Sequence, residues 1–301
     1  MLLHFIGTNI DLTQKDLYIH TLEAALMGGG IGVELPLVRW IGRQIPTETC
    51  KKLFRGNRFI MQYGQKAVEE SQQRDDTTTI FSKIISEAGK GESISQDDVV
   101  HEATALIVAG SDTTGITLTY LVWAVLSRPQ LQAELVEELA SLSQAYTNQD
   151  LEGKPLLNAV INETLRLYGA APGSLPRAVP EQGMTLGDYY LRPGTIVSTQ
   201  AYTIHRDGQI FSQPDKFDPS RFLNDAKKNE AEKIAFHPFG AGSRICLGLH
   251  LAQMELRLAV VEFFRTFKDA KLAPSTTQQS MEMENFFLIA PKSHKCEIVI
   301  A

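Results

Sequence analysis

Apolar residues recur every three to four positions along much of this chain, which is the spacing of one face of an α-helix. Pro129 sits where one of these segments begins, and proline suits the first turn of a helix. The pattern therefore predicts a mainly helical protein. The predicted helices cover residues 11–27, 48–71, 97–127, 129–145, 155–168 and 247–267.

Residues 170–235 change in character. Six prolines fall in this segment, and residues 194–198 (GTIVS) are rich in β-branched side chains, so they are typical of a β-strand. Residues 288–300 are expected to form a closing hairpin around residues 291–293. The predicted fold class is therefore mainly α with small β-sheets (α+β).

Two segments are expected to interrupt the helices before residue 96. Residues 28–30 are three consecutive glycines, which destabilise a helix, so the first helix should end there. Residues 71–79 (SQQRDDTTT) are polar and are predicted to form a surface loop.

No membrane anchor is expected from the sequence. Residues 1–7 are apolar but too short for a signal peptide. Residues 103–126 are long enough to span a bilayer, but Asp112 lies near the centre, where a charge facing lipid is costly. A long helix buried in protein is the better interpretation.

Composition narrows the function classes. The formal net charge of −6 and the pI near 5.7 argue against nucleic acid as a main partner. Three scattered cysteines form no disulfide framework, which indicates a reducing compartment, and the seven histidines show no zinc-binding spacing. A chain of 301 residues can bury one large core or two small ones.

The most informative segment is residues 239–248, which read FGAGSRICLG directly before a predicted helix. Its glycines allow tight bends, and a helix N-terminus favours the ionised form of a nearby thiol. Cys246 is therefore suited to act as a metal-binding thiolate, and Arg244 adds a cation suited to carboxylates. The alternative is a buried structural cysteine before a helix.

A second segment, residues 109–114 (AGSDTT), lies in the middle of the longest predicted helix. Ala109 and Thr113 are four residues apart and share a helix face, where the small alanine leaves room for a flat cofactor. Gly110 weakens the helix, and threonine hydroxyls can divert a backbone carbonyl from its normal partner. The alternative is an ordinary buried helix rich in serine and threonine.

Together these segments resemble the cytochrome P-450 superfamily of haem-thiolate monooxygenases. The loop matches the family's haem-binding pattern F-x-x-G-x-R-x-C-x-G, and residues 109–114 match its oxygen-activating helix. The resemblance implies a P-450 fold with haem b, in which Cys246 is the axial ligand of the iron and Arg244 contacts a propionate. It also implies that Phe239 packs beside the sulfur and that Gly248 lets the helix approach the porphyrin.

The resemblance assigns roles to the oxygen-activating helix as well. Thr113 would stabilise iron-bound peroxide, and Asp112 would belong to the route that delivers protons. Ala109 and Gly110 would line the face of the helix that meets the cofactor.

Glu163 and Arg166, within the predicted helix 155–168, form the family's E-x-x-R pattern in the family's order. As a bare pattern, two residues three apart often form no more than a surface ion pair. The resemblance implies that the pair is buried, is joined by Arg221, and holds the cysteine loop in place.

Two further positions are less specific. Arg177 lies where the family often has an arginine that binds a propionate, although it could equally be a plain surface arginine. His205 resembles a residue near the edge of the cofactor, but a histidine with a structural role is the favoured interpretation. Nothing indicates that His237 is a second ligand.

The resemblance suggests a single partial P-450 domain over residues 1–301. Its expected parts are helices in 1–96, the oxygen-binding helix in 97–127, the E-x-x-R helix in 155–168, and the haem-thiolate loop with its following helix in 236–267. Residues 172–177 and 250–257 resemble fungal secondary-metabolism members. Residues 40–43 do not supply the family's W-x-x-x-R segment, and the chain looks N-terminally truncated.

Two functions follow as hypotheses. The first is a monooxygenase that oxidises a lipophilic small molecule, using O2 and electrons from an NADPH-dependent cytochrome P-450 reductase. The second is a truncated remnant of such an enzyme that is non-catalytic or binds haem weakly. A thiolate-haem isomerase or dehydratase is disfavoured because Asp112 and Thr113 are intact. The family is usually anchored to the endoplasmic reticulum, so the cytoplasmic side of that membrane is the expected location.

Overall fold

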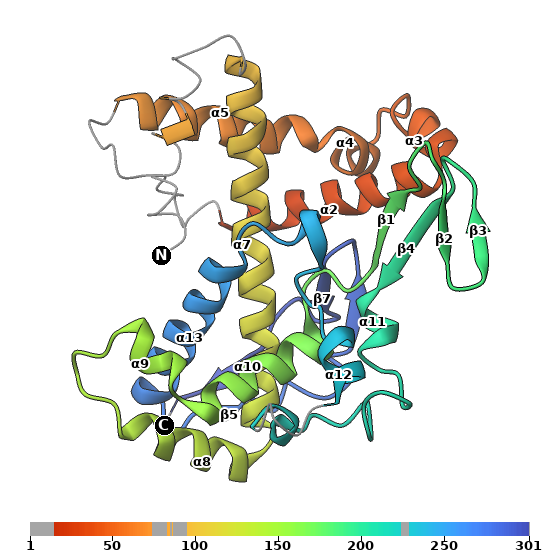
Figure 1. Cartoon of the computed structure of the whole chain (residues 1–301). Helices are drawn as coiled ribbons and strands as arrows, with labels where there is room; N and C mark the ends of the chain where they lie inside the picture. Colours follow the sequence, from red (N-terminus) through yellow and green to blue (C-terminus); the bar gives the residue numbers. More distant parts are fainter. Residues whose placement is uncertain (1–14, 74–82, 85, 87–94, 224–228, 301) are drawn as a thin grey trace. The chain divides into compact units, whose positions relative to one another are not determined.

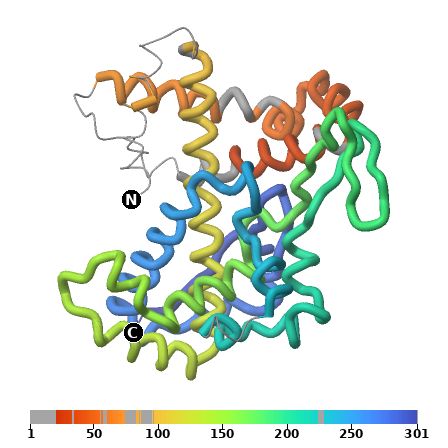
Figure 2. The backbone as a smooth tube through the Cα atoms, in the orientation of Figure 1, coloured from red at the N-terminus to blue at the C-terminus, as the bar shows by residue number. Residues whose placement is uncertain are grey.

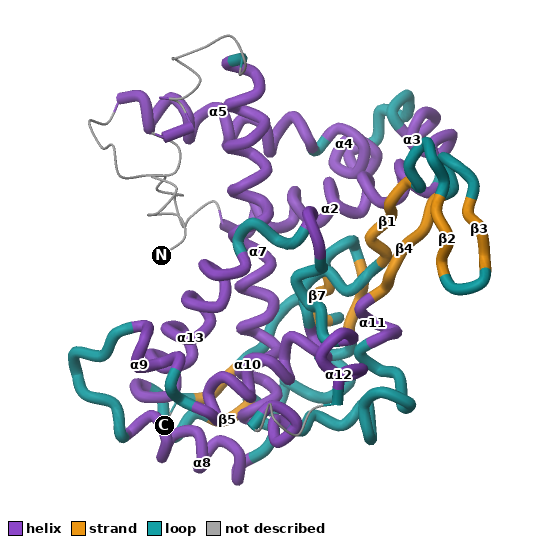
Figure 3. The backbone as a smooth tube through the Cα atoms, viewed as in Figure 1, coloured by secondary structure: helices purple, strands orange, loops and turns teal. Residues whose placement is uncertain are grey.

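The computed structural model describes residues 15–73, 83–84, 86, 95–223 and 229–300. Helices predominate in these residues, and the strands are short and paired in twos (Figures 1 and 3). The predicted fold class, mainly α with small β-sheets, is confirmed. The chain divides into two compact units: Met1–Gly115 with Asn285–Phe287, and Ile116–Glu284 with Leu288–Ala301.

The first unit is helical. Its core consists of alanines and larger aliphatic side chains, and these lie mainly on the faces of three helices. The helices of this unit are α2 (Lys15–Glu34), α3 (Pro36–Gly42), α4 (Glu48–Arg55), α5 (Asn57–Gln73) and the part of α7 (Gln96–Leu126) before Ile116. The core residues are Leu22, Ala25, Ile60, Ala67, Val68, Val99, Ala103 and Ile107.

The prediction that residues 28–30 end the first helix is wrong, because α2 continues to Glu34. Gly28 is buried against α4, where a Cβ atom would collide with the backbone carbonyl of Leu53. This glycine therefore permits close packing of two helices instead of terminating one. Residues 11–14 of the predicted helix lie outside the described residues, as do residues 1–7.

The single helix predicted over residues 48–71 is in fact two helices, α4 and α5, separated at Gly56. Gly56 is buried, and a Cβ atom there would lie 3.0 Å from the side chain of Ala25 in α2. The absent side chain of Gly56 therefore allows the junction between α4 and α5 to approach α2 closely. The predicted polar loop begins later than expected, because α5 includes residues 71–73; residues 74–79 lie outside the described residues.

The second unit begins with the C-terminal part of α7 and contains most of the remaining helices. They are α8 (Pro129–Ala140), α9 (Asn148–Glu152), α10 (Pro155–Tyr168), α11 (Ala201–Ile204), α12 (Glu230–Ala235) and α13 (Leu249–Thr266). The helix predicted over 129–145 ends early, at Ala140, and α9 begins separately from a capping box at Thr147. Helix α10 has the predicted bounds.

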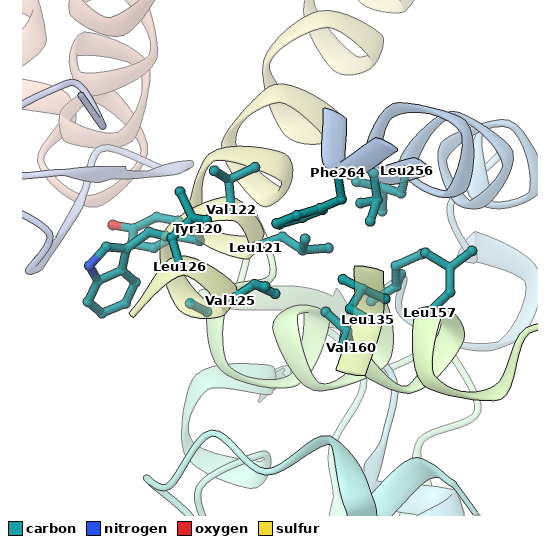
Figure 4. Packing of buried hydrophobic residues seen from close by; sticks show 14 of the residues in the cluster. Tyr120, Leu121, Val122, Val125, Leu126, Leu135, Leu157, Val160, Leu256 and Phe264 are labelled. Atoms are coloured by element: carbon teal, nitrogen blue, oxygen red, sulfur yellow. The ribbon is translucent and has the colours of Figure 1, made fainter. Parts of the chain in front are cut away.

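The hydrophobic core of the second unit is formed where α7, α8, α10 and α13 meet (Figure 4). Leu121 of α7, Leu135 of α8, Leu157 of α10 and Phe264 of α13 are each fully buried. This core packs against one face of α10 and gives the buried polar residues of that helix a rigid base.

Within the ranges that the structure describes, the strands form four short two-stranded sheets, nearly all of whose residues belong to the second unit, and the path of the chain can be followed in Figure 2. Strand β1 (Ser174–Ala178) pairs with β4 (Ile196–Gln200), β2 (Met184–Leu186) with β3 (Tyr189–Leu191), β5 (Lys271–Leu272) with β8 (Ile298–Val299), and β6 (Met283–Asn285) with β7 (Ile289–Pro291). The expected hairpin over residues 288–300 is wrong, because β7 and β8 pair with earlier strands and not with each other.

Among the described residues, one helical segment, Asp97–Leu126, has the length and apolar composition needed to cross a membrane. The core helix of a soluble protein meets the same two conditions. In this chain, the C-terminal turns of α7 are buried in the hydrophobic core of the second unit, where Tyr120, Leu121, Ala124 and Val125 are fully buried.

Candidate active site

The cysteine loop connects α12 to α13 in the second unit. Gly240 and Gly242 have φ angles of +74° and +71°, in the left-handed region that favours glycine. Cys246 lies between these two glycines and α13, and its backbone N–H donates a hydrogen bond of 2.9 Å to the carbonyl of Phe239. This bond closes the loop on itself, so the position of Cys246 depends on the position of Phe239.

Gly248 differs from the other two glycines, because its φ of −85° is available to any residue. The expectation that the backbone needs glycine there for a tight bend is wrong. A Cβ atom at Gly248 would lie 3.9 Å from the sulfur of Cys246, so the absent side chain leaves the space beside the thiol open. Gly248 is the N-cap of α13, and the thiol therefore stands within three residues of a helix N-terminus.

The outer surface of the loop combines a thiol, a cation and two apolar side chains. Cys246 is exposed, as are Ile245 and Leu247, and Leu247 is 91% exposed. Within the described part of the chain, the guanidinium of Arg244 makes no hydrogen bond or ion pair. Phe239 has a different environment, because it is partly buried and packs against the hydrophobic core. The alternative of a buried structural cysteine does not agree with this exposure.

Glu163 and Arg166 of α10 form a buried ion pair beneath this region. Both side chains are fully buried, and Glu163 receives two hydrogen bonds from Arg166, of 2.7 Å from Nε and 2.8 Å from Nη2. Arg166 also donates to the backbone carbonyls of His205 and Pro214, each over 2.6 Å. A buried arginine that makes this many hydrogen bonds is fully compensated.

Arg221 joins this pair, as the resemblance implied. It lies in the 3₁₀-helix η2 (Pro219–Phe222), and its Nε is 3.4 Å from Oε1 of Glu163. The backbone N–H of Asp218, at the N-cap of η2, donates to the same oxygen over 2.7 Å. Glu163 therefore connects α10 to a segment more than fifty residues later in the chain.

His205 follows α11 and is 1% exposed. Its Nδ1 lies 3.1 Å from the backbone carbonyl of Arg166, and its Nε2 accepts a hydrogen bond of 3.1 Å from the backbone N–H of His237. Burial lowers the pKa of His205 to about 4, so the ring is neutral at physiological pH. The expected structural role agrees with this burial.

Arg177 lies in β1 and is exposed. Its Nη1 donates to the carbonyl of the neighbouring Pro176 over 2.8 Å, and the pairing of β1 with β4 sets Arg177 opposite Val197. The contact with Pro176 is local, so the structure leaves both interpretations of Arg177 open.

The segment Ala109–Thr113 belongs to the first unit and lies within the unbroken helix α7. The hydroxyl of Thr113 donates a hydrogen bond of 2.8 Å to the backbone carbonyl of Ala109, which is the diversion expected from the sequence. Ala109 is exposed, so this face carries no bulky side chain of its own. Gly110 lies within the helix and does not break it.

Asp112 has the perturbed titration expected of a residue that handles protons. Burial, and to a smaller degree the charge of Glu23, raise the pKa of Asp112 to about 6. A carboxyl group with a pKa near neutrality can both accept and release a proton under physiological conditions. Asp112 is one residue from Thr113 and so points to a neighbouring sector of α7.

Comparison with models of known protein families identifies the family to which this chain belongs. The family model described as Cytochrome P-450 matches residues 32–298, which is most of the chain. This chain belongs to the cytochrome P-450 family. The match includes the exposed Cys246, the buried Glu163 network and the Ala109–Thr113 segment of α7.

Several curated fungal members of the family are similar to this P-450 chain. The cytochrome P-450 monooxygenase cypX of Dothistroma septosporum is 42% identical over 254 residues, covering 83% of this chain and 49% of the relative. The monooxygenase aflV of Aspergillus parasiticus is 42% identical over 270 residues, covering 87% and 53%, respectively. The monooxygenase stcB of Emericella nidulans is 42% identical over 236 residues, covering 78% and 45%. The chain thus spans about half the length of these relatives.

The residues of the cysteine loop fit a haem group by their chemistry. Haem offers an iron that accepts a thiolate, carboxylates that pair with arginine, and an apolar ring. The loop presents an exposed thiol at Cys246, a guanidinium without a partner among the described residues at Arg244, and exposed apolar side chains at Ile245 and Leu247. Exposed apolar side chains that lie together beside polar groups are typical of a ligand-binding surface, and each of these groups gains a suitable partner from haem.

One functional feature was missed by sequence reasoning. The family resemblance placed His205 near the edge of the cofactor, but no local pattern connects it by hydrogen bonds to the cysteine loop, because both of its ring nitrogens contact backbone groups, which any residue type provides. The adjacent Arg206 also bonds to the backbone of α10, with Nη2 2.5 Å from the carbonyl of Leu167. The signal available in the sequence was only a histidine and an arginine side by side in a segment rich in prolines.

Proposed function

We propose that this chain provides the haem-binding and oxygen-activating part of a haem-thiolate monooxygenase of the fungal secondary-metabolism type. Its substrate would be a lipophilic small molecule, oxidised with O2 and with electrons from an NADPH-dependent cytochrome P-450 reductase. The observation that carries this proposal is the exposed thiol of Cys246, placed by two left-handed glycines directly before the N-terminus of α13.

Cys246 would bind the haem iron as a thiolate. The N-terminus of α13 favours the ionised sulfur, and Arg244 is available to pair with a propionate. Arg177 would bind the other propionate, and Phe239, which packs against the hydrophobic core, would shield the sulfur from water on one side. Haem b, when bound, would supply the redox chemistry of oxygen activation, and the thiolate of Cys246 would tune it by donating electron density to the iron.

Thr113 and Asp112 would hold and transfer protons. The hydroxyl of Thr113 donates to the carbonyl of Ala109, and because a hydroxyl can rotate it would also be able to donate a hydrogen bond to a ligand on this face of the helix. Asp112, with its pKa raised to about 6, would take protons from solvent and release them toward Thr113. The exposed Ala109 and the adjacent Gly110 leave the helix surface flat enough for a planar ligand.

Glu163, Arg166 and Arg221 would contribute no chemistry of their own. Their ion-pair network connects α10 to η2, and removing one partner of a buried pair leaves an uncompensated charge. This network would therefore keep the second unit rigid beneath the cysteine loop. A rigid base matters because small displacements of a ligand in an active site reduce rates strongly.

The test is reconstitution of the purified chain with haem b, followed by measurement of the haem-to-chain ratio and of NADPH-dependent product formation. The assay contains a fungal cytochrome P-450 reductase, O2 and a panel of lipophilic aromatic compounds. The proposal predicts stoichiometric haem binding and substrate oxidation that Thr113→Ala reduces by uncoupling NADPH use from product. Sub-stoichiometric, loosely held haem and no product would favour the alternative, a weakly haem-binding remnant. Product formation without NADPH or O2 would instead indicate an isomerase or dehydratase.

A further inference from the structure

His205 is the point where the buried network of α10 meets the cysteine loop. Arg166 and His205 are joined twice: the guanidinium of Arg166 donates to the carbonyl of His205, and the His205 ring bonds to the carbonyl of Arg166. The ring is also enclosed by aromatic groups, with ring centroids 5.7 Å from Phe236 and 6.4 Å from Phe211. These contacts fix both the position and the orientation of the imidazole.

The hydrogen bonds of His205 determine its tautomer. The carbonyl of Arg166 can only accept, so Nδ1 must carry the proton. The backbone N–H of His237 can only donate, so Nε2 must present its lone pair. Both partners are backbone groups with fixed roles, and His205 therefore connects them only as a neutral ring protonated at Nδ1.

From His237 the connection continues to Cys246 through the backbone. The carbonyl of His237 accepts a hydrogen bond of 3.0 Å from the N–H of Gly240, which closes the turn that contains the left-handed glycine. Phe239, within this turn, accepts the hydrogen bond of 2.9 Å from the N–H of Cys246. Two backbone bonds thus separate the residue that contacts His205 from the residue that carries the thiol.

We propose that His205 is a positioning residue for Cys246: its Nε2 anchors the N–H of His237 and so sets the turn on which the cysteine loop is built. This inference rests on the proposed function for its significance, since the thiol matters only if it binds haem. The positioning itself is a property of the chain without haem and is tested on that state.

Two substitutions of His205 test its two ring nitrogens separately: the acceptor Nε2 and the donor Nδ1. The side-chain amide of Gln reaches the position of Nε2 and can accept from His237, whereas that of Asn reaches only the position of Nδ1 and can bond to Arg166. His205→Gln should therefore preserve the cysteine loop, and His205→Asn should release it. His101→Asn serves as the control, because His101 is exposed and its Nδ1 also bonds to a backbone carbonyl, that of Asp97.

Amide hydrogen exchange of the haem-free chain measures the effect residue by residue. A single hydrogen bond corresponds to about a tenfold change in a local equilibrium. In His205→Asn, the amides of His237, Gly240 and Cys246 should exchange about tenfold faster, while core amides of α10 keep their protection. In His205→Gln and His101→Asn, the same three amides should exchange at wild-type rates. Unchanged exchange in His205→Asn, or equally faster exchange throughout the second unit, would overturn the proposal, because a purely structural role predicts a uniform effect.

The wild-type chain offers a second measurement that needs no substitution. Long-range 1H–15N NMR spectra distinguish the two neutral tautomers of histidine, and the proposal requires that His205 carry its proton on Nδ1. A proton on Nε2 would overturn the proposal even if every variant failed to fold. Failure of the wild-type chain to bind haem would contradict the proposed function but would leave the exchange and tautomer results unaffected. If haem binds, the carbon monoxide complex of His205→Asn should contain a larger thiol-ligated fraction than that of His205→Gln.

Discussion

Replacement of Glu163 by glutamine should destabilise the second unit strongly, although the side chain keeps its size. Glu163 is fully buried and accepts hydrogen bonds from Arg166, Arg221 and the backbone of Asp218. Glutamine has one acceptor oxygen in place of two, and its NH2 group would face the Arg166 guanidinium, a donor facing a donor. The positive charge of Arg166 would also remain buried without a counter-charge.

The structure indicates the size of this effect. Removing one partner of a buried ion pair costs about 3–5 kcal/mol, whereas an exposed pair contributes about 0–1 kcal/mol. The total stability of a domain is about 5–15 kcal/mol, so Glu163→Gln should remove a large fraction of it. Glu230→Gln is a matched control, because Glu230 pairs with Lys233 at the same i, i+3 spacing and 2.8 Å apart, but on the surface.

Urea unfolding followed by circular dichroism provides the assay, with both variants measured beside the wild type at pH 7. Glu163→Gln should lower the free energy of unfolding by about 3–5 kcal/mol, and Glu230→Gln by less than about 1 kcal/mol. Equal small losses in the two variants would refute the reasoning, because they would show that the Glu163 charge is not needed for the stability of the buried arginines.

Three further results are expected. The pKa of His205 is about 4 in the folded chain and about 6.5 in the unfolded chain, so the free energy of unfolding should fall by up to about 3 kcal/mol as the pH drops through this range. In urea titrations, His205→Gln should remove that fall. An identical pH dependence in the variant would contradict the low pKa of His205. Because burial raises the pKa of Asp112 from 3.8 to about 6, ionising this carboxyl destabilises the folded state, and the free energy of unfolding should fall as the pH rises through this range. Asp112→Asn, which cannot ionise, should therefore be about 1–3 kcal/mol more stable than wild type at pH 7. A less stable variant would show that the buried carboxylate is compensated by its surroundings. In α2, Gly28→Ala should destabilise the folded chain by about 1–3 kcal/mol, because the added methyl group would collide with the backbone of Leu53. Gly29→Ala has open space at its Cβ position and should stabilise the chain by up to about 1 kcal/mol. Thermal unfolding that ranks the two variants in the opposite order would show that the close approach of α2 and α4 is absent.

The sequence predicted best those features that depend on local pattern. Helix α10 begins and ends at the predicted residues because its apolar period is strong and Pro155 marks its first turn. The left-handed conformations of Gly240 and Gly242 agree with the tight bends that the glycines of the loop allow, although Gly248 in the same loop does not adopt one. The association of Glu163 with Arg221 came from the family resemblance, since nothing local connects residues that are 58 positions apart.

The errors share a physical cause, which is long-range packing. Gly28 interrupts no helix, because its missing side chain lets α4 lie against α2, whereas Gly56, which also lies close to α2, falls at the break between α4 and α5. The same residue type thus occurs within a helix and between two helices, and in both places it packs closely against a neighbour that the local pattern does not reveal. The C-terminal strands β7 and β8 each find an earlier partner, and their own composition is equally compatible with a hairpin. The role of His205 was hidden for the same reason, since its partners are backbone groups 39 and 32 residues away.

The central claim, that Cys246 is the thiolate ligand of a haem iron, is tested most directly by the carbon monoxide difference spectrum of the reduced, haem-reconstituted chain. The wild-type chain should give the strongly red-shifted Soret band that thiolate ligation produces, and Cys246→Ala should lose it. Cys296→Ala, which removes a half-buried cysteine of the same unit, should retain the band. A red-shifted band that persists in Cys246→Ala would contradict the account, because another residue would then have to be the ligand.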